Sequence, residues 1–291
     1  MADNLIELIK VLRDRTGAGL MDCKGALLAN DCDLDKAHDW LREKGLAKAA
    51  KKASRIAAEG LAVVETCECC GRAIVLEVNC ETDFVAKGDA FRELVETTAK
   101  VILKENCTTV EEAKAATEAL FVDATVKMGE KFDLRRFTIL TKEEGELINS
   151  YLHNGGKIAV AVKINKEDAD LAKQLAMHIA ANNPTYVKES DIPADVIAHE
   201  KQIQTELAKN DEKLANKPAE VLSKILDGKV KKIFSESTLE HQPFLMDDSK
   251  TVGQYLKEKG VEIVQFVRYQ VGEGIEKRQD DFAAEVMSQV G

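Results

Sequence analysis

The sequence of 291 residues has no apolar run that approaches the roughly 18 residues needed to cross a lipid bilayer. Its start, residues 1–4, also lacks the basic segment and the long apolar stretch that are typical of a secretory signal. We therefore expect a cytoplasmic protein that is not held in a membrane.

Catalytic and nucleotide-binding motifs are also lacking. The sequence contains no G-x-x-x-x-G-K-[ST], H-E-x-x-H or G-x-S-x-G motif, and Gly272 and Gly274 lack the third glycine of a dinucleotide-binding turn. A thiol enzyme would need Cys80 and a base such as His153 within hydrogen-bond reach, and nothing in the sequence predicts that proximity. His178 lies on the apolar face of a predicted helix, which is typical of a hydrogen-bonded core histidine. The sequence thus predicts no enzyme, no catalytic residue, no cofactor and no direct nucleotide binding.

Positive charge is in the minority, since 41 Lys and Arg residues stand against 51 Asp and Glu residues and give a net charge of -10. This balance argues against a protein whose main task is to bind phosphate backbones, so no specific nucleic-acid partner is expected. One basic segment stands out, with six basic residues from Arg42 to Arg55 against the single acid Glu43. That segment is either a solvated helix face beside a domain boundary or a contact for an acidic partner or RNA.

The cysteines do not form a disulfide framework or a complete zinc motif. Their number, seven, is odd, which in a chain without a leader indicates free thiols in a reducing compartment. Cys67 and Cys70 form a C-x-x-C, with Cys69 and Cys80 nearby, but the second pair that a four-ligand zinc site usually requires is missing. We expect reduced thiols at a hairpin turn and no metal site.

The chain exceeds the range of about 100 to 200 residues that is typical of one domain, so several folded units are expected. The first unit is helical. Apolar residues at helical spacing predict a helix that stops near Thr16, and a second helix follows over residues 20–30. Asp33 or Asp35 then caps a third helix, which has Gly45 near its end. Three short helices around one core are typical of a ubiquitin-associated-like domain.

The next part of the chain has a strand–helix–strand pattern. Two β-branched runs, 61–64 and 73–78, flank the Cys-rich segment and predict a β-hairpin. Asp89 then caps a helix, and a strand over 133–140 ends the unit. The helix presents one apolar face, formed by Phe91, Leu94, Val95, Thr98 and Ile102.

The same order recurs later in the chain. A strand over 158–164 precedes a helix that carries Leu171 and Leu175, and the segment 260–269 echoes 129–138. We therefore expect an α+β protein whose core consists of two related strand–helix–strand subdomains.

A polar insertion at about 192–230 interrupts the second subdomain and reads as an antiparallel helical hairpin. Its apolar stripe packs either within the hairpin alone or also against another subunit or partner. The basic, alanine-rich segment 46–58 is expected to tether the first domain. The expected domains are the helical domain with its basic linker at 1–55, the core subdomains at 56–142 and 143–271, and a C-terminal helical module at 272–291 with its helix at 280–290.

A segment that carries a family resemblance lies where a strand gives way to a helix, at residues 79–86, Asn-Cys-Glu-Thr-Asp-Phe-Val-Ala. From its position alone, Phe84 is interpreted as a core residue at a strand–helix junction. The segment nevertheless resembles the Thr-Asp-Phe-Val motif of the elongation factor Ts family, and residues 13–24 resemble the N-terminal block of that family. Further matching blocks follow in order along nearly the whole chain, at 156–162, 242–246, 251–254 and 271–277.

The resemblance implies an exchange factor of translation elongation that binds the GTPase elongation factor Tu, expels GDP and lets GTP bind. It implies that the segment Thr82, Asp83, Phe84 and Val85 intrudes near the magnesium site of the GTPase. It further implies N-terminal contacts by Arg13, Leu20 and Met21, and core contacts by Met128, Gly129, His153, Leu245 and Met246. The hairpin matches the coiled-coil insertion of the family, and the C-terminal helix matches its partner-binding terminal module. A homodimer or a 2:2 complex is left open.

A competing interpretation is an adaptor whose helical domain binds ubiquitin-like proteins or nascent-chain peptides. The three predicted helices permit it. The Thr-Asp-Phe-Val segment and the matching C-terminal half would then have no purpose.

Overall fold

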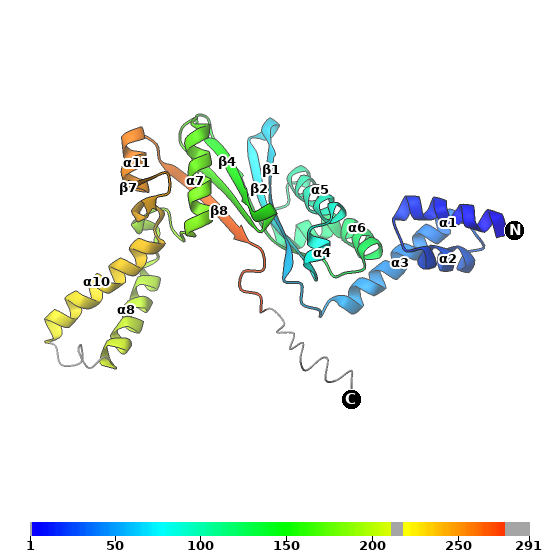
Figure 1. Cartoon of the computed structure of the whole chain (residues 1–291), viewed down its shortest axis with the longest axis horizontal. Helices are drawn as coiled ribbons and strands as arrows, with labels where there is room; N and C mark the ends of the chain where they lie inside the picture. The colour runs from blue at the N-terminus through cyan, green and yellow to red at the C-terminus, as the bar shows by residue number, and fades with distance from the viewer. Residues whose placement is uncertain (1, 211–217, 277–291) are drawn as a thin grey trace. The chain divides into compact units, whose positions relative to one another are not determined.

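The computed structural model describes residues 2–210 and 218–276, and the chain divides into two compact units (Figure 1). Of the described residues, the first unit contains those up to Ile139, the segment Asn154–Ala159 and those from Tyr269 to Glu276. The second contains Leu140–His153 and Val160–Arg268. Helices and antiparallel strands occur together, which confirms the α+β class. No helix within the described ranges is long and apolar enough to span a membrane.

The first unit begins with three helices, as predicted: α1 (Ala2–Thr16), α2 (Leu20–Ala29) and α3 (Leu34–Lys52). Asp33 is the residue that caps α3, because its carboxylate accepts hydrogen bonds from the backbone N–H groups of Asp35 and Lys36 at 3.0 and 3.1 Å. The core between these helices is formed by Ile9, Leu12, Ala18, Cys23, Ala26, Leu27, Ala37 and Leu41.

Gly45 does not lie near the end of the third helix, as the sequence suggested, but in its interior. It is buried, and a Cβ atom at this position would lie only 2.5 Å from Cγ2 of Val126 in helix α6 (Val110–Met128). The glycine is therefore tolerated in the helix because it permits close approach of α3 to α6. Residues 46–52 of the expected tether belong to α3, so the first part of this segment is helical.

A three-stranded sheet forms the centre of the first unit, in the order β1 (Glu59–Cys67), β2 (Arg72–Cys80) and β3 (Asp133–Thr141). Strands β1 and β2 pair antiparallel from Glu59 opposite Cys80 to Cys67 opposite Arg72, which confirms the predicted hairpin. The connection between them contains the short 3-10 helix η1 (Glu68–Cys70), and Gly71 ends this helix with a φ of 62°. This positive φ suits glycine, which has no Cβ to clash.

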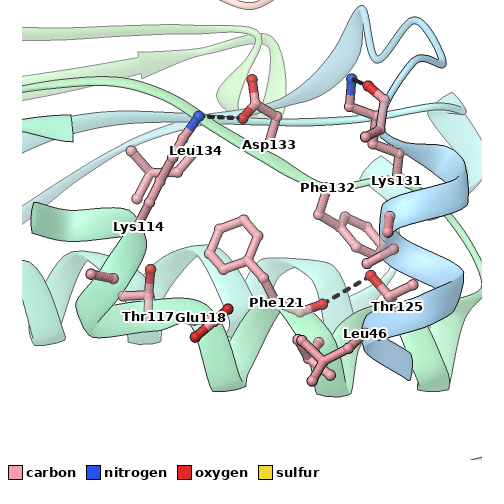
Figure 2. Close-up of a pocket in the computed structure, with 15 residues that line it drawn as sticks. Leu46, Lys114, Thr117, Glu118, Phe121, Thr125, Lys131, Phe132, Asp133 and Leu134 are labelled. Atoms are coloured by element: carbon pink, nitrogen blue, oxygen red, sulfur yellow. Dashed lines mark hydrogen bonds and ion pairs between the residues drawn. The ribbon is translucent and has the colours of Figure 1, made fainter. Parts of the chain in front are cut away.

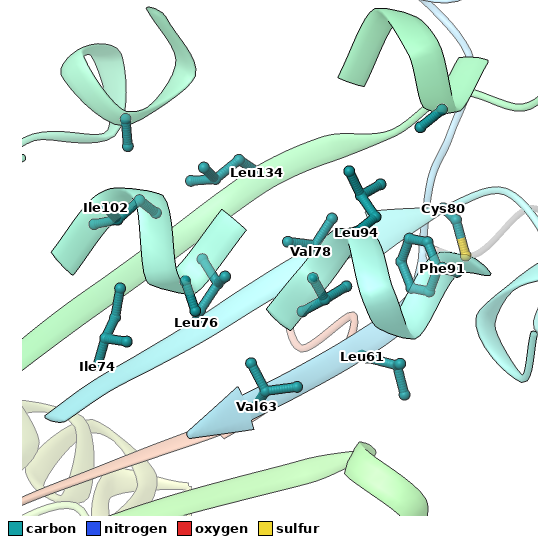
Figure 3. Close-up of a cluster of buried hydrophobic side chains, with 14 of the residues drawn as sticks. Leu61, Val63, Ile74, Leu76, Val78, Cys80, Phe91, Leu94, Ile102 and Leu134 are labelled. Atoms are coloured by element: carbon teal, nitrogen blue, oxygen red, sulfur yellow. The ribbon is translucent and has the colours of Figure 1, made fainter. Parts of the chain in front are cut away.

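Helices α4 (Asp83–Ala86), α5 (Asp89–Glu105) and α6 follow β2. The predicted apolar face of α5 is buried against the sheet (Figure 3). Asp89 is not the cap of α5, however. Gly88 occupies the N-cap position and Asp89 is the first helical residue, where its charge still complements the helix dipole.

Helix α6 was not anticipated, although the sequence marks its start. Thr109 and Glu112 form a capping box, in which the Thr109 hydroxyl accepts from the Glu112 N–H at 3.2 Å and the Glu112 carboxylate accepts from the Thr109 N–H at 3.3 Å.

A buried carboxylate joins β2 to β3 and to the chain after β8 (Ile263–Gln270). The side chain of Glu77 is fully buried and forms ion pairs with Arg135 at 2.9 Å and Arg136 at 2.6 Å. It also accepts a hydrogen bond from the backbone N–H of Gly272 at 2.8 Å. Gly272 has a φ of 72°, and a Cβ there would collide with the carbonyl oxygen of Ala58. The sequence block at 271–277 therefore has a structural role that its local pattern did not reveal.

The second unit is built on a sheet in the order β4 (Leu147–His153), β5 (Ile158–Ile164) and β8. Helix α7 (Ala169–Asn182) packs on β4, and its predicted apolar face is buried. A two-stranded sheet of β6 (Pro243–Phe244) and β7 (Asp247–Thr251) and the helix α11 (Val252–Lys259) complete the unit. The sequence analysis did not foresee β4, β6, β7 or α11.

The insertion of the second unit contains α8 (Ala194–Lys209) and α10 (Ala219–Ser237), which pack on one another. An ion pair of 2.7 Å joins Lys201 to Asp227 across the two helices. The predicted apolar stripe is only partly covered, since Val196, Leu222 and Ile225 are half-buried whereas Ile203, Leu207 and Val221 are exposed. The predicted C-terminal helix at 280–290 lies outside the described residues.

Candidate partner-binding site

The segment Thr82–Val85 forms the start of the short helix α4, directly after the buried strand β2. Thr82 is the N-cap of α4, and its hydroxyl oxygen accepts a hydrogen bond from the backbone N–H of Val85 at 3.3 Å. Gly88 then caps α5, which begins at Asp89, so α4 is a single turn between two longer elements. This single turn redirects the chain from the sheet to α5.

Phe84 points into solvent. Its exposed fraction is 84%, whereas Val85 is half-buried against the core and Ala86 is buried. The interpretation of Phe84 as a core residue is therefore wrong. Within the single turn of α4, Val85 and Ala86 take the inward positions and leave Phe84 on the outer side. An aromatic ring exposed to this degree is a candidate anchor for a partner protein.

Glu130 holds the backbone that leads into this turn. One of its carboxylate oxygens accepts hydrogen bonds from the N–H groups of Glu81 and Thr82 at 3.0 and 3.1 Å. The other accepts from the hydroxyl of Thr82 at 2.5 Å. Hydrogen bonds to an ionised acceptor are stronger than neutral ones, so this contact orients the start of α4. Glu130 was missed from the sequence because it lies 48 residues away from Thr82.

A second contact runs in the opposite direction between the same two segments. The carboxylate of Glu81 accepts a hydrogen bond from the backbone N–H of Lys131 at 2.7 Å and forms an ion pair with Arg55 at 3.1 Å. The ammonium group of Lys131 donates to the carbonyl oxygens of Ala53 and Arg55 at 2.7 and 2.8 Å. The residues that follow α3 are thus fastened to the same loop that orients the Phe84 turn.

Met128 and Gly129 form the end of α6, immediately before Glu130. Gly129 caps the helix with a φ of 75°, and its N–H donates to the carbonyl oxygen of Thr125 at 3.0 Å. The carbonyl oxygen of Gly129 accepts a hydrogen bond from the ammonium group of Lys52. Met128 is half-buried against the core of the first unit. The structure therefore brings this predicted pair together with the Phe84 turn through Glu130.

Asp83 is paired within its own helix. Its carboxylate accepts a hydrogen bond from Lys87, one turn later, at 2.6 Å. This hydrogen bond and the positive charge of Lys87 lower the pKa of Asp83 below its ordinary value. Asp83 is therefore ionised at neutral pH. Both side chains are substantially exposed, so the pair is easily exchanged for another partner.

The predicted N-terminal residues gather where α1 meets α2. Arg13 lies in the last turn of α1, and Leu20 and Met21 begin α2. All three are exposed, Met21 by 71%. Two neighbouring exposed apolar side chains on the first turn of α2 form a second candidate contact surface.

In the second unit, Leu245 and Met246 lie at the β6–β7 turn and are both exposed. The backbone N–H of Leu245 donates to Nδ1 of the fully buried His178 at 3.2 Å. Nε2 of His178 donates to Oε1 of Gln242 at 2.9 Å. This confirms His178 as a core histidine with satisfied hydrogen bonds, and it shows that the imidazole supports the Leu245 turn.

His153 is the last residue of β4 and is exposed. Its Nδ1 lies 3.3 Å from the hydroxyl of Tyr151, which is two residues earlier on the same strand.

The buried thiol next to the Phe84 turn is chemically inert. Cys80 is fully buried, and its Sγ donates to the carbonyl oxygen of Thr82 at 3.2 Å. Burial, together with the nearby charge of Glu130, raises the pKa of this thiol to about 12. A thiol with this pKa supplies no thiolate at neutral pH, which argues against a thiol enzyme that uses Cys80.

A groove of about 700 Å³ lies between α3, α6 and the start of β3 (Figure 2). Leu46, Phe121 and Phe132 are among its lining residues, and an ion pair of 2.8 Å between Lys114 and Asp133 lies at its edge. The predicted contact residues do not line this groove. The candidate site therefore lies outside this groove.

An exposed aromatic residue on a clamped turn is typical of a protein that acts by binding a partner. Residues 81–273, well over half of the chain, match the family model described as Elongation factor TS. The chain therefore belongs to the elongation factor Ts family, whose members are non-catalytic exchange factors for elongation factor Tu in translation elongation. This confirms the resemblance drawn from the sequence.

Proposed function

We propose that the protein exchanges nucleotide on elongation factor Tu by inserting Phe84 into the GTPase near its magnesium site. The observation that carries the proposal is the exposure of Phe84 on a turn that Glu130 orients. Because the turn is held before the partner arrives, little ordering entropy remains to be lost on binding. Thr82 and Val85 complete the tip, Thr82 as the cap and Val85 as the inward anchor.

Free energy limits what Phe84 achieves alone. An exchange factor binds the nucleotide-free GTPase more tightly than the loaded one, and by linkage the nucleotide weakens the binding of the factor equally. Each tenfold of this antagonism requires about 1.4 kcal/mol of differential binding. Burial of one phenylalanine contributes about 1.5–3 kcal/mol, which corresponds to about one to two powers of ten. A second contact is therefore needed.

Asp83 provides an electrostatic contribution at the same tip. Its lowered pKa keeps it ionised, and its partner Lys87 lies on the same exposed helix turn. When the tip enters the GTPase, the carboxylate of Asp83 disturbs the shell of water and oxygen ligands on which Mg²⁺ depends. Weaker Mg²⁺ binding then loosens GDP.

The surface of Arg13, Leu20 and Met21 supplies the second contact, near the phosphate-binding loop of the GTPase. The packing of Gly45 against α6 and the contacts of Lys52 and Lys131 support this assignment, because they tie α3 to the loop that orients the tip. Two contacts on one connected unit act together more effectively than two on a flexible chain.

Other surfaces extend the contact with elongation factor Tu. We assign Met128, Gly129, His153, Leu245 and Met246 to the core part of this interface. We assign the hairpin of α8 and α10 to the coiled-coil insertion of the family and the segment 272–291 to its terminal module.

The domain scheme proposed from the sequence accompanies this function. It has a ubiquitin-associated-like domain at 1–55 and two related core subdomains at 56–142 and 143–271. The relatedness is supported by the two sheets, each of which has three strands. The site of action is the cytoplasm, where translation factors meet their GTPase.

Release of a fluorescent GDP analogue from elongation factor Tu tests the proposal. The wild-type protein is expected to accelerate release, and Phe84→Ala is expected to slow the stimulated release by about ten- to a hundredfold. Val264→Ala, which truncates an exposed apolar residue of β8, is the matched control and should release GDP at the wild-type rate.

The exposure of Phe84 means that its removal should leave the fold intact, which circular dichroism and thermal unfolding verify. A folded Phe84→Ala protein that stimulates release at the wild-type rate would refute the role of the tip. A pull-down tests the competing interpretation. If the captured GTPase stays bound after GDP is added, the result would instead favour an adaptor.

A further inference from the structure

Three thiols converge at the turn of the β1–β2 hairpin. Sγ of Cys67 lies 3.0 Å from Sγ of Cys69, and the sulfur atoms of Cys67, Cys69 and Cys70 all lie within 4.8 Å of one another. The 3-10 turn and the left-handed Gly71 bring them to the same side of the turn. Cys69 and Cys70 are exposed and Cys67 is half-buried, so an ion in solution can reach the sulfur atoms.

The spacing of the sulfur atoms fits a single soft metal ion. A Zn–S bond is about 2.3 Å long, so thiolates at two corners of a tetrahedron lie about 3.8 Å apart. The observed separations, 3.0 Å for one pair and up to 4.8 Å for the set, bracket that value. Cys67 and Cys69 have to move apart by less than about 1 Å to reach this value, which small side-chain rotations at an exposed turn supply.

A fixed cation stands beside this cluster. Nε of Arg72 donates to Sγ of Cys70 at 3.2 Å. The same guanidinium group donates to Oδ1 of Asn106 at 2.6 Å and to the carbonyl oxygen of Leu103 at 2.9 Å, both at the end of α5. Such an outer hydrogen bond orients a ligand and tunes the metal. Three thiolates around a divalent ion leave one net negative charge, which Arg72 balances.

We propose that Cys67, Cys69 and Cys70 bind one soft divalent ion of the zinc class, with water as the fourth ligand. Binding breaks three S–H bonds, forms three metal–sulfur bonds, releases three protons to solvent and displaces water from the ion. The sequence rule that demands a second C-x-x-C overlooked this site, because the third sulfur comes from inside the first motif.

The remaining thiols make the assignment testable. Cys23 is buried in the core of the three N-terminal helices, Cys80 and Cys107 are buried in the core that contains Phe91, and Cys32 is partly exposed. Cys32 is therefore the matched control for an accessible thiol outside the cluster.

The site is remote from the Phe84 turn. The cluster lies where Cys67 pairs with Arg72, and the turn follows the other end of the hairpin, where Glu59 pairs with Cys80. Eight residue steps along the strand separate these ends, or about 26 Å. Loss of the metal is therefore expected to leave nucleotide exchange unchanged, so the metal site and the exchange function fail independently.

Metal binding is measured on the reduced, metal-free, full-length protein. Zn²⁺ is titrated against a chromophoric chelator, and Cd²⁺ is followed by thiolate-to-metal charge-transfer absorption. One ion per chain is expected for the wild-type protein and for Cys32→Ser. Cys67→Ser, Cys69→Ser and Cys70→Ser should each weaken binding at least about tenfold, and Arg72→Gln should weaken it about tenfold with all three sulfurs retained.

Two results would overturn the proposal. One is a triple serine variant that binds Zn²⁺ as tightly as the wild-type protein. The other is a Cys69→Ser protein that binds with wild-type affinity, because the C-x-x-C pair alone would then account for the binding. Circular dichroism checks that each variant keeps its fold.

Discussion

Thr82 donates two hydrogen bonds to the carboxylate of Glu130, one from its N–H at 3.1 Å and one from its hydroxyl at 2.5 Å. The same Thr82 hydroxyl oxygen caps α4 by accepting from Val85. A single threonine therefore links the loop after α6 to the helix turn that exposes Phe84. The orientation of Phe84 therefore depends on Glu130, a residue that we do not assign to the partner contact.

Glu130→Ala should slow the stimulated release of GDP while having little effect on the free energy of unfolding. The variant removes the acceptor of three hydrogen bonds and leaves Phe84 in place. A turn that is no longer oriented has to be ordered on binding, and a cost of about 1.4 kcal/mol lowers the stimulated rate about tenfold. Stimulated release of a fluorescent GDP analogue provides the measurement.

The control for this variant is Glu118→Ala, which removes an exposed glutamate in the interior of α6. It should exchange nucleotide at the wild-type rate. Equal rates for Glu130→Ala and the wild-type protein would show that orientation of the turn does not limit exchange.

Two glycines in helices should respond in opposite ways to alanine. At Gly45 a Cβ would lie 2.5 Å from Val126, so Gly45→Ala should lower the free energy of unfolding by about 1–3 kcal/mol through overpacking. At Gly25, in α2, a Cβ would meet no atom within 4 Å, so Gly25→Ala should raise it by about 0.5–1 kcal/mol. Urea unfolding of both variants measures the two effects.

Exchange assays on the same pair separate stability from function. Gly45→Ala pushes α3 away from α6 and should weaken the joint action of the two contact surfaces, whereas Gly25→Ala should exchange normally. A stabilised Gly45→Ala protein would show that the close approach of α3 and α6 is not required.

Removal of the buried carboxylate should be costly. Glu77→Ala leaves Arg135 and Arg136 without their shared partner in a largely buried setting and leaves the N–H of Gly272 unpaired. We expect a loss of about 3 kcal/mol in the free energy of unfolding. Glu65→Ala is the control, because its ion pair with Lys100 is long, at 4.0 Å, and partly exposed, and its loss should cost under about 1 kcal/mol. Chemical denaturation distinguishes the two, and equal losses would contradict the role of Glu77.

The stability of the second unit should fall in mild acid because of His178. Burial lowers the pKa of His178 below its ordinary value of 6.5. Nδ1 also accepts from the N–H of Leu245, so a proton there would face a donor. Between the folded and unfolded pKa values the unfolded chain binds more protons, so stability rises with pH in that window.

The contribution of His178 is accordingly complete well above pH 6.5 and is lost as the pH falls from 6.5 through the folded pKa. The slope reaches at most about 1.4 kcal/mol per pH unit. His178→Asn should be less stable at neutral pH but should lose this part of the pH dependence. His199→Asn, at an exposed position of α8, should retain it. Urea titrations at several pH values give the slopes, and a wild-type slope in His178→Asn would exclude this origin.

Local patterns in the sequence determined much of the fold. The spacing of apolar residues predicted the three N-terminal helices, the β1–β2 hairpin and the apolar face of α5, which contains Phe91 and Ile102. A helix buries every third or fourth side chain, and a strand buries every second one. The family also followed from the sequence, since blocks such as residues 79–86 occur in order. Gly45 and Asp89 were misread because glycine and aspartate occur at helix ends so often that an interior glycine or a first-turn aspartate mimics a cap.

The tertiary structure alone decided which side of α4 faces solvent and what holds it there. Phe84 is exposed because Val85 and Ala86 pack inward. A helix of four residues is too short for a repeating pattern of apolar residues to show which side faces the core. The contact of Thr82 with Glu130 joins segments 48 residues apart and depends on where the loop after α6 lies in space. Such contacts are set by the packing of the whole unit and leave no repeating pattern in the chain.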